Sequence, residues 1–139
     1  MAGVELVWLR REVYRHYAAT GRPPALSAAD LAALEAAHAV VLDDAGAIAF
    51  ANPFATGPAP FRVQTAAQTL YAICAWDALG VLAALGTDGT VRSQCPDCAQ
   101  AITIRVRQGG LEPAEGEPAE AVVHFLVPAV RWYEDLGFT

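Results

Sequence analysis

The sequence lacks the features of an exported or membrane-anchored protein. No apolar run reaches the roughly 18 residues of a membrane span, and Glu5 and Arg10 stand where a signal peptide would have its apolar stretch. Cysteine is scarce, with three residues. An odd number without an export signal argues against a disulfide framework and favours free thiols or thiolate ligands. We therefore expect a cytoplasmic protein whose thiols are the main candidates for chemistry.

Basic residues are also few, and lysine is absent. Nine arginines against fifteen acidic residues give a net charge of -6, which works against binding to the polyanionic backbone of nucleic acid. The group formed by Arg10, Arg11, Arg15 and Arg22 is more typical of a solvated face than of a DNA contact. We expect neither a nucleic-acid nor a membrane partner, and a DNA-binding regulator using residues 4–50 is the weaker alternative. The oligomeric state stays open.

The composition is that of a globular protein, with 55 % hydrophobic and 17 % charged residues. Apolar residues at helical spacing predict a first helix over residues 4–19. Ser27 is a candidate N-cap for a second helix that reaches about residue 38. Two short segments on either side of a polar, glycine-containing turn then predict a hairpin of strands 40–42 and 47–50. Two helices and a hairpin predict a winged-helix-like segment over residues 1–51.

The following segment is rich in proline, which disfavours both helix and central-strand pairing. Residues 52–65 are therefore predicted to form an extended linker before a second domain at 66–139. In that domain, a largely apolar stretch predicts a buried helix over 66–85, interrupted near Gly80. The remaining predictions are strands over 90–94 and 101–107, a solvated loop over 109–120, a buried strand over 121–127 and a helix beginning within 130–136.

Cys74 and Asp77 are the first candidate site. Three residues apart on the predicted helix, they would share one face. A thiolate can bind a soft metal or attack, and a neighbouring carboxylate can hold or deliver a proton. On spacing alone, the favoured alternative is a core cysteine beside an aspartate that faces solvent or caps a backbone amide.

Cys95 and Cys98 form a Cys-x-x-Cys pair on a proline-containing turn between two predicted strands. Such a pair can chelate one metal ion, cycle between dithiol and disulfide, or remain a pair of structural thiols, and the sequence favours none of these. A structural zinc site needs four ligands, so Cys74, Asp77 or His124 would have to complete it from a distance. His124 itself is more typical of a satisfied core or surface histidine.

Several blocks of sequence resemble the alkylmercury lyase (organomercurial lyase) family. The specific block is Tyr71-x-x-Cys74-x-x-Asp77, which follows the proline-rich segment. The similarity covers most of the chain and includes Asn52-Pro-Phe, Pro58-Ala-Pro-Phe-Arg-Val63, Ser93-Gln-Cys95 and His124-Phe-Leu-Val-Pro128.

The resemblance implies a cytosolic enzyme that cleaves carbon–mercury bonds by protonolysis. Cys74 matches the family's first catalytic cysteine and Asp77 its proton-handling aspartate. The implied fold is α+β, with a winged-helix-like helical segment followed by a mixed β-sheet domain. The implied substrate is a small organomercurial or another thiophilic molecule. No cofactor is required, with Hg(II) as product or bound soft metal and zinc as another possible occupant.

One feature of the family has no match in the sequence. The second catalytic cysteine is expected downstream of residues 122–127, around or just after 132–139, and no cysteine lies there. Three interpretations remain: the chain is part of a longer protein, Cys95 or Cys98 replaces the missing thiol, or the protein binds a metal without cleaving a bond. We expect Cys74, Cys95 and Cys98 to be metal ligands. The alternative function is a non-catalytic protein that uses these thiols to bind or sense zinc, copper or mercury.

Overall fold

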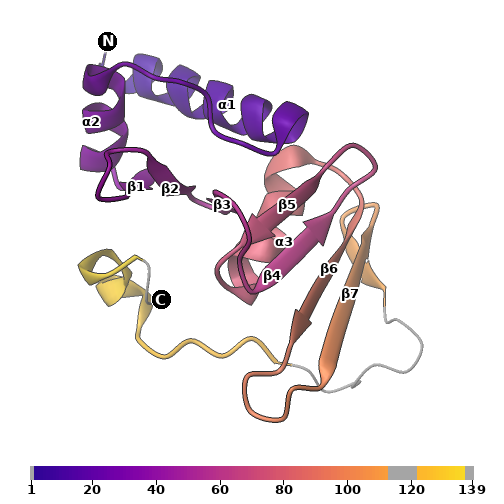
Figure 1. The fold of residues 1–139 in the computed structure, drawn as a ribbon. Coiled ribbons are helices and arrows are strands. Elements are labelled where there is room, and N and C mark those ends of the chain that lie inside the picture. Colours follow the sequence, from indigo (N-terminus) through magenta and orange to yellow (C-terminus); the bar gives the residue numbers. More distant parts are fainter. Residues whose placement is uncertain (1, 113–121, 137–139) are drawn as a thin grey trace.

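The computed structural model describes residues 2–112 and 122–136 (Figure 1). In these residues, two helices come first, followed by five strands, a third helix, three more strands and a 3-10 helix, and the strands join one sheet. The elements are α1 (Ala2–Thr20), α2 (Ala28–Ala36), β1 (Val40–Leu42), β2 (Ile48–Ala51), β3 (Phe54–Ala55), β4 (Phe61–Gln64), β5 (Thr69–Ala72), α3 (Ala75–Leu85), β6 (Gly89–Gln94), β7 (Ala101–Arg107), β8 (Gly110–Glu112) and the 3-10 helix η1 (Ala129–Glu134).

The described strands form one antiparallel sheet in the order β1-β2-β3-β5-β4-β6-β7-β8. The expectation of a mixed sheet is therefore wrong, although the α+β class is confirmed. The reason lies in the connection through α3. It joins β5 to β6, but β4 lies between these strands and pairs antiparallel with both.

The N-terminal elements follow the predicted order of two helices and a hairpin. The hydroxyl of Ser27 accepts the backbone N–H of Asp30 at 3.1 Å, which confirms the predicted N-cap of α2. In the turn between β1 and β2, the Asp43 carboxylate accepts the N–H groups of Ala45 and Ala47, each at 2.9 Å. Side-chain caps of this kind are local and can be predicted from sequence. The winged-helix character of this segment stays a prediction.

The predicted linker contains two strands, so the expectation that this segment avoids central pairing is wrong. β3 pairs with β2 and β5, and β4 pairs with β5 and β6. Pro53 directly precedes β3, and Pro58 and Pro60 lie between β3 and β4. Phe54 is 1 % exposed and stacks on Tyr17 at 4.9 Å between ring centroids. Burial of this ring offsets the poor strand propensity of its neighbours. The division of the chain into domains at residues 52–65 stays a prediction.

The predicted helix over 66–85 is wrong in its first half. Residues 69–72 form β5, with Leu70 and Ala72 buried and Thr69 and Tyr71 half-buried, the period-two pattern of a strand. Gly80 does not interrupt α3. It allows close packing instead, because a Cβ there would lie 3.3 Å from the Cβ of Pro53.

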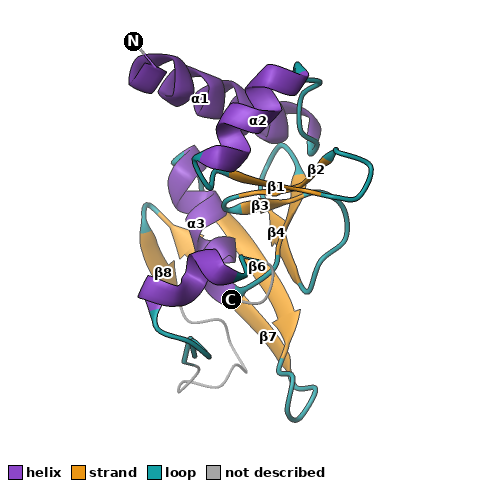
Figure 2. Ribbon diagram, turned by 90° about the vertical axis from the view of Figure 1, so that its left-hand side faces the viewer, coloured by secondary structure: helices purple, strands orange, loops and turns teal. Residues whose placement is uncertain are grey.

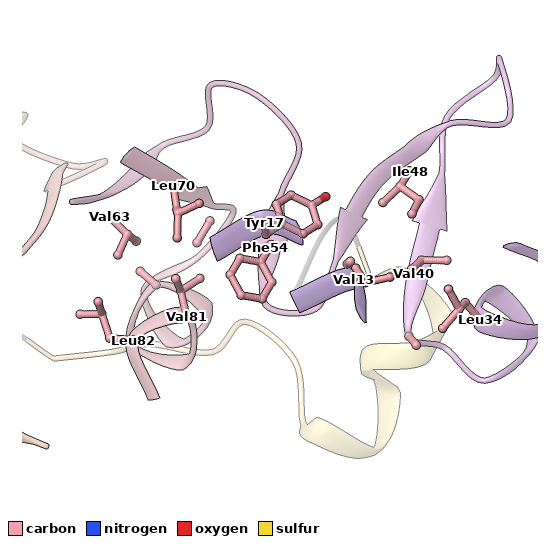
Figure 3. Packing of buried hydrophobic residues seen from close by; sticks show 14 of the residues in the cluster. Val13, Tyr17, Leu34, Val40, Ile48, Phe54, Val63, Leu70, Val81 and Leu82 are labelled. Carbon is pink, nitrogen blue, oxygen red and sulfur yellow. The ribbon is translucent and has the colours of Figure 1, made fainter. Parts of the chain in front are cut away.

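One hydrophobic cluster connects the N-terminal helices with α3 and the sheet (Figure 3). At one side, Leu34, Val40 and Ile48 pack between α2 and the first hairpin. At the other side, α3 packs on β4 and β5 through buried residues that include Val81, Leu82, Val63 and Leu70. Tyr17 and Phe54 lie between these groups. The core therefore holds the N-terminal end of α3 in a defined place.

The C-terminal half confirms the predicted strands as β6 and β7, while β8 lies in the predicted solvated loop, of which residues 113–120 lie outside the described residues. The predicted strand over 121–127 is wrong, because residues 122–127 form no strand and 122–126 are exposed. Residue 121 lies outside the described part. The helix predicted within 130–136 is present as η1. It is a 3-10 helix, which is wound more tightly than an α-helix. None of the helices within residues 2–112 and 122–136 is both long and apolar enough to cross a membrane.

Candidate active site

Cys74 lies at the junction between β5 and α3 and is the N-cap of that helix. Its backbone is extended, with φ -139° and ψ 169°, and its Sγ accepts the backbone N–H of Asp77 at 3.3 Å. Asp77 is therefore in the first helical turn. The structure brings the two predicted residues together, but through a cap at the start of a helix rather than through one face of a longer helix.

Burial raises the pKa of both groups. Cys74 and Asp77 are half-buried, and loss of water is the largest cause of the raised pKa of each. A side-chain hydrogen bond between them raises the pKa of the Cys74 thiol and lowers that of the Asp77 carboxyl. The two side chains are therefore close enough to affect each other's titration, and burial favours the uncharged form of each.

The pair lines a pocket of about 410 Å³. The wall opposite α3 comes from a segment that is distant in sequence, residues 125–136. The lining residues are Asn52, Cys74, Trp76, Asp77, Phe125, Ala129, Trp132, Tyr133 and Leu136. The site therefore combines one thiol and one carboxyl group with a mainly aromatic surround.

Ring contacts hold the distant wall against the rest of the molecule. Phe125 lies edge-on to Trp76 at 6.0 Å and against Trp132 at 5.0 Å, both between ring centroids. The indole N–H of Trp132 donates to the Val127 carbonyl at 3.0 Å. These contacts take the place of the predicted strand pairing. Figure 1 shows the segment in yellow, returning from the β7 side of the sheet to a position near the first hairpin.

A second ring contact fixes the end of this segment. Tyr133 stacks on His38 with 4.6 Å between ring centroids. His38 has a positive φ of 54° just before β1, and its carbonyl accepts the side-chain N–H of Asn52 at 3.3 Å. The aromatic lining was missed by the sequence reasoning, because nothing in the spacing of Trp76, Phe125 and Trp132 indicates that they meet.

Cys95 and Cys98 lie elsewhere, in the turn that joins β6 to β7. In both views this turn projects from the far end of the two strands (Figures 1 and 2). Neither residue lines the pocket, and no group of three histidine, cysteine, aspartate or glutamate residues that could hold a metal is found among the described residues. The expected joint ligand set of Cys74, Cys95 and Cys98 is therefore not assembled. His124 is exposed and does not complete a set.

Comparisons with known proteins point to one family. The family model described as alkylmercury lyase matches residues 54–137, more than half of the chain. A solved structure described as the mercury-bound form of MerB2 is 25 % identical, with a TM-score of 0.53. The match covers 61 % of this chain and 41 % of that one, so this chain spans less than half of that protein. No curated protein matches. With more than half of its length matched by the family model, the chain belongs to the alkylmercury lyase family.

Proposed function

We propose that this protein cleaves carbon–mercury bonds by protonolysis, with Cys74 as the capturing thiol and Asp77 as the proton carrier. The observation that carries the proposal is the Cys74–Asp77 pair. A thiol and a carboxyl group affect each other's pKa at the start of α3, inside a pocket with aromatic walls. Family membership supports the same chemistry.

Capture exchanges a proton for mercury on Cys74. Sulfur is a soft ligand that binds mercury strongly, whereas carboxylate and hydroxyl oxygens are hard. As the S–Hg bond forms, the thiol loses its proton. Asp77 accepts this proton in the proposed step, because its carboxyl group acts on the Cys74 thiol. From a substrate R–Hg–X, in which X is an anionic ligand such as chloride, the products of this step are an organomercury thiolate, a protonated Asp77 and free X⁻.

Cleavage then uses the proton that capture released. Asp77 delivers it to the carbon atom, and the electron pair of the carbon–mercury bond becomes the new carbon–hydrogen bond. Hg(II) stays on the thiolate and Asp77 becomes a carboxylate again, so protons and electrons balance. The raised pKa of Asp77 favours this role, because burial stabilises the neutral acid relative to the carboxylate.

The aromatic lining gives the organic group its place. Trp76, Phe125 and Trp132 offer ring faces and edges beside the sulfur. Moving an apolar aryl or alkyl group from water onto this surface would be favourable. A charged group would lose its hydration and gain no charged or hydrogen-bonding partner. We infer that the substrates are apolar organomercurials. All three cysteines of the chain lie in the described part and only Cys74 lines the pocket, so capture here depends on this one thiol.

The test separates capture from cleavage with Asp77→Asn. Asparagine keeps the size of the side chain but cannot carry the proton. Release of the arene from an arylmercurial should fall about 10²- to 10⁴-fold, while mercury bound per chain should stay unchanged. The matched control is Asp44→Asn, at an exposed aspartate in the first hairpin turn. Equal loss of capture and cleavage in Asp77→Asn would make Asp77 a ligand or a structural residue and would overturn its proposed role.

A further inference from the structure

The turn at Cys95 and Cys98 holds two thiols that the proposed cleavage does not use. It joins β6 to β7, whose strands are paired from Gly89↔Val106 to Gln94↔Ala101. At its base, the N–H of Cys95 donates to the Gln100 carbonyl at 2.8 Å, and the N–H of Ala99 donates to the Cys95 carbonyl at 2.9 Å. The paired strands and these two bonds hold both cysteines in one closed turn.

Hydrogen bonds within the turn lower the pKa of the Cys95 thiol. Their donors are the N–H groups of Cys98 and Asp97 and the thiol of Cys98. Hydrogen-bond donors stabilise the negatively charged thiolate relative to the neutral thiol. Ala99 has a positive φ of 56°, so the chain turns away directly after Cys98. Cys98 is exposed and Cys95 is half-buried, so both sulfurs are open to a ligand from solvent.

We propose that the Cys95–Cys98 turn is a separate binding site for one soft cation that accepts two-coordinate ligation, such as Hg²⁺ or Cu⁺, held by both thiolates. The site goes beyond the proposed cleavage and does not depend on it. Binding replaces two S–H bonds with two S–metal bonds and releases the protons to solvent, so no oxidant or reductant is needed.

Two thiolate ligands suit a soft cation with two-coordinate ligation better than they suit zinc. A structural zinc site takes four ligands, whereas no group of three candidate ligands is present in residues 2–112 and 122–136. Two thiolates are sufficient for a soft ion that prefers few sulfur ligands. The turn should therefore hold mercury or copper in the presence of a competing thiol and should not hold zinc.

The test uses the Cys74→Ser protein, in which only the two turn thiols remain. Serine is a preferred N-cap, so α3 should keep its start and the protein its fold, as circular dichroism would verify. We expect added HgCl₂ to give one mercury per chain by native mass spectrometry and to protect both thiols from Ellman's reagent. Copper(I) should protect them in the same way, and zinc chloride should leave both thiols reactive.

The matched control is the Cys74→Ser/Cys98→Ser protein, which keeps a single thiol. Because two linked thiolates act at a high effective concentration, 2-mercaptoethanol should remove mercury from this control at roughly tenfold or more lower concentration than from the pair. Equal removal from both proteins, free thiols after addition of mercury, mercury bridging two chains, or zinc held as strongly as mercury would each overturn the proposal. None of these results bears on cleavage by the wild-type pocket, whose test is arene release.

Discussion

The chain contains two short motifs that begin with a cysteine, Cys74-x-x-Asp77 and Cys95-x-x-Cys98. The hydrogen bonding around the first sulfur is alike in both. In each, a backbone N–H three residues later points to the first sulfur. The surroundings differ. Burial raises the pKa of Cys74, whereas Cys95 lies in a projecting hairpin turn, where hydrogen bonds lower its pKa. A short motif therefore sets which donors meet the sulfur, and tertiary burial sets whether the thiol or the thiolate is favoured.

The largest expected effect is on turnover, and it should appear in the Cys74 motif but not in the Cys95 motif. Cys74→Ser should reduce arene release from an arylmercurial by at least about 10³-fold, because an alcohol is a poor ligand for mercury and no second thiol lines the pocket. The double variant Cys95→Ser/Cys98→Ser should retain wild-type turnover to within about twofold, since both changes are on a projecting turn. Turnover would be followed by gas chromatography of the arene. Loss of activity in the double variant alone would reverse the assignment of the two regions.

The second effect concerns the packing between α3 and the strand that leads to the turn. A Cβ at Gly89 would lie 2.7 Å from the Gln64 carbonyl oxygen and 2.5 Å from a methyl carbon of Leu82. Because the carbonyl belongs to the backbone, Gly89→Ala should lower the free energy of unfolding by about 1–3 kcal/mol. Urea denaturation would measure the loss.

The control for this prediction is Gly3→Ala. A Cβ at Gly3 meets nothing within 4 Å, and alanine favours a helix. This variant should be neutral or slightly more stable than the wild type. If both alanine variants unfold at the same urea concentration, the close approach of β6 to α3 does not limit stability.

A smaller effect should show whether the aromatic lining of the pocket binds substrate. The turn at Cys95 and Cys98 has no such lining. Trp132→Ala removes the ring that packs on Phe125 at 5.0 Å. Ring pairs of this kind contribute about 0.5–1.5 kcal/mol, so KM for an arylmercurial should rise about two- to tenfold, with a smaller change in kcat. Trp8→Ala is the control, because Trp8 is 59 % exposed on α1 and does not line the pocket. An unchanged KM in Trp132→Ala would remove the wall from substrate binding.

The smallest effect tests the difference between the thiols directly. Iodoacetamide reacts with thiolates, so at neutral pH it should modify Cys95 several-fold faster than Cys74. As pH rises, the rate at Cys95 should level off first, since its pKa is lowered, and the rate at Cys74 should continue to rise. Peptide mapping by mass spectrometry would give both rates from one sample. Equal rates at neutral pH, or an earlier plateau for Cys74, would contradict the opposite pKa directions.

The sequence by itself determined the features that depend on neighbouring residues. The Ser27 cap, the first hairpin, the strands on both sides of Cys95 and Cys98 and the family resemblance were all predicted correctly. Hydrogen bonds in caps and tight turns span a few residues, so they can be inferred from local spacing. The association of Cys74 with Asp77 was also predicted, because a spacing of three brings side chain and backbone together in a cap as well as on a helix face. Their catalytic roles stay predictions.

Only the tertiary structure decided which residues line the pocket and which of the three thiols lies in it. Phe54 enters the sheet despite the prolines around it because its ring is buried against Tyr17. Residues 69–72 become a strand because β3 and β4 offer edges to pair with. The pocket exists because Phe125 and Trp132 pack toward Trp76 across a long sequence separation. Such contacts are absent from any local window, and the same burial raises the pKa of Cys74 while Cys95 stays outside it.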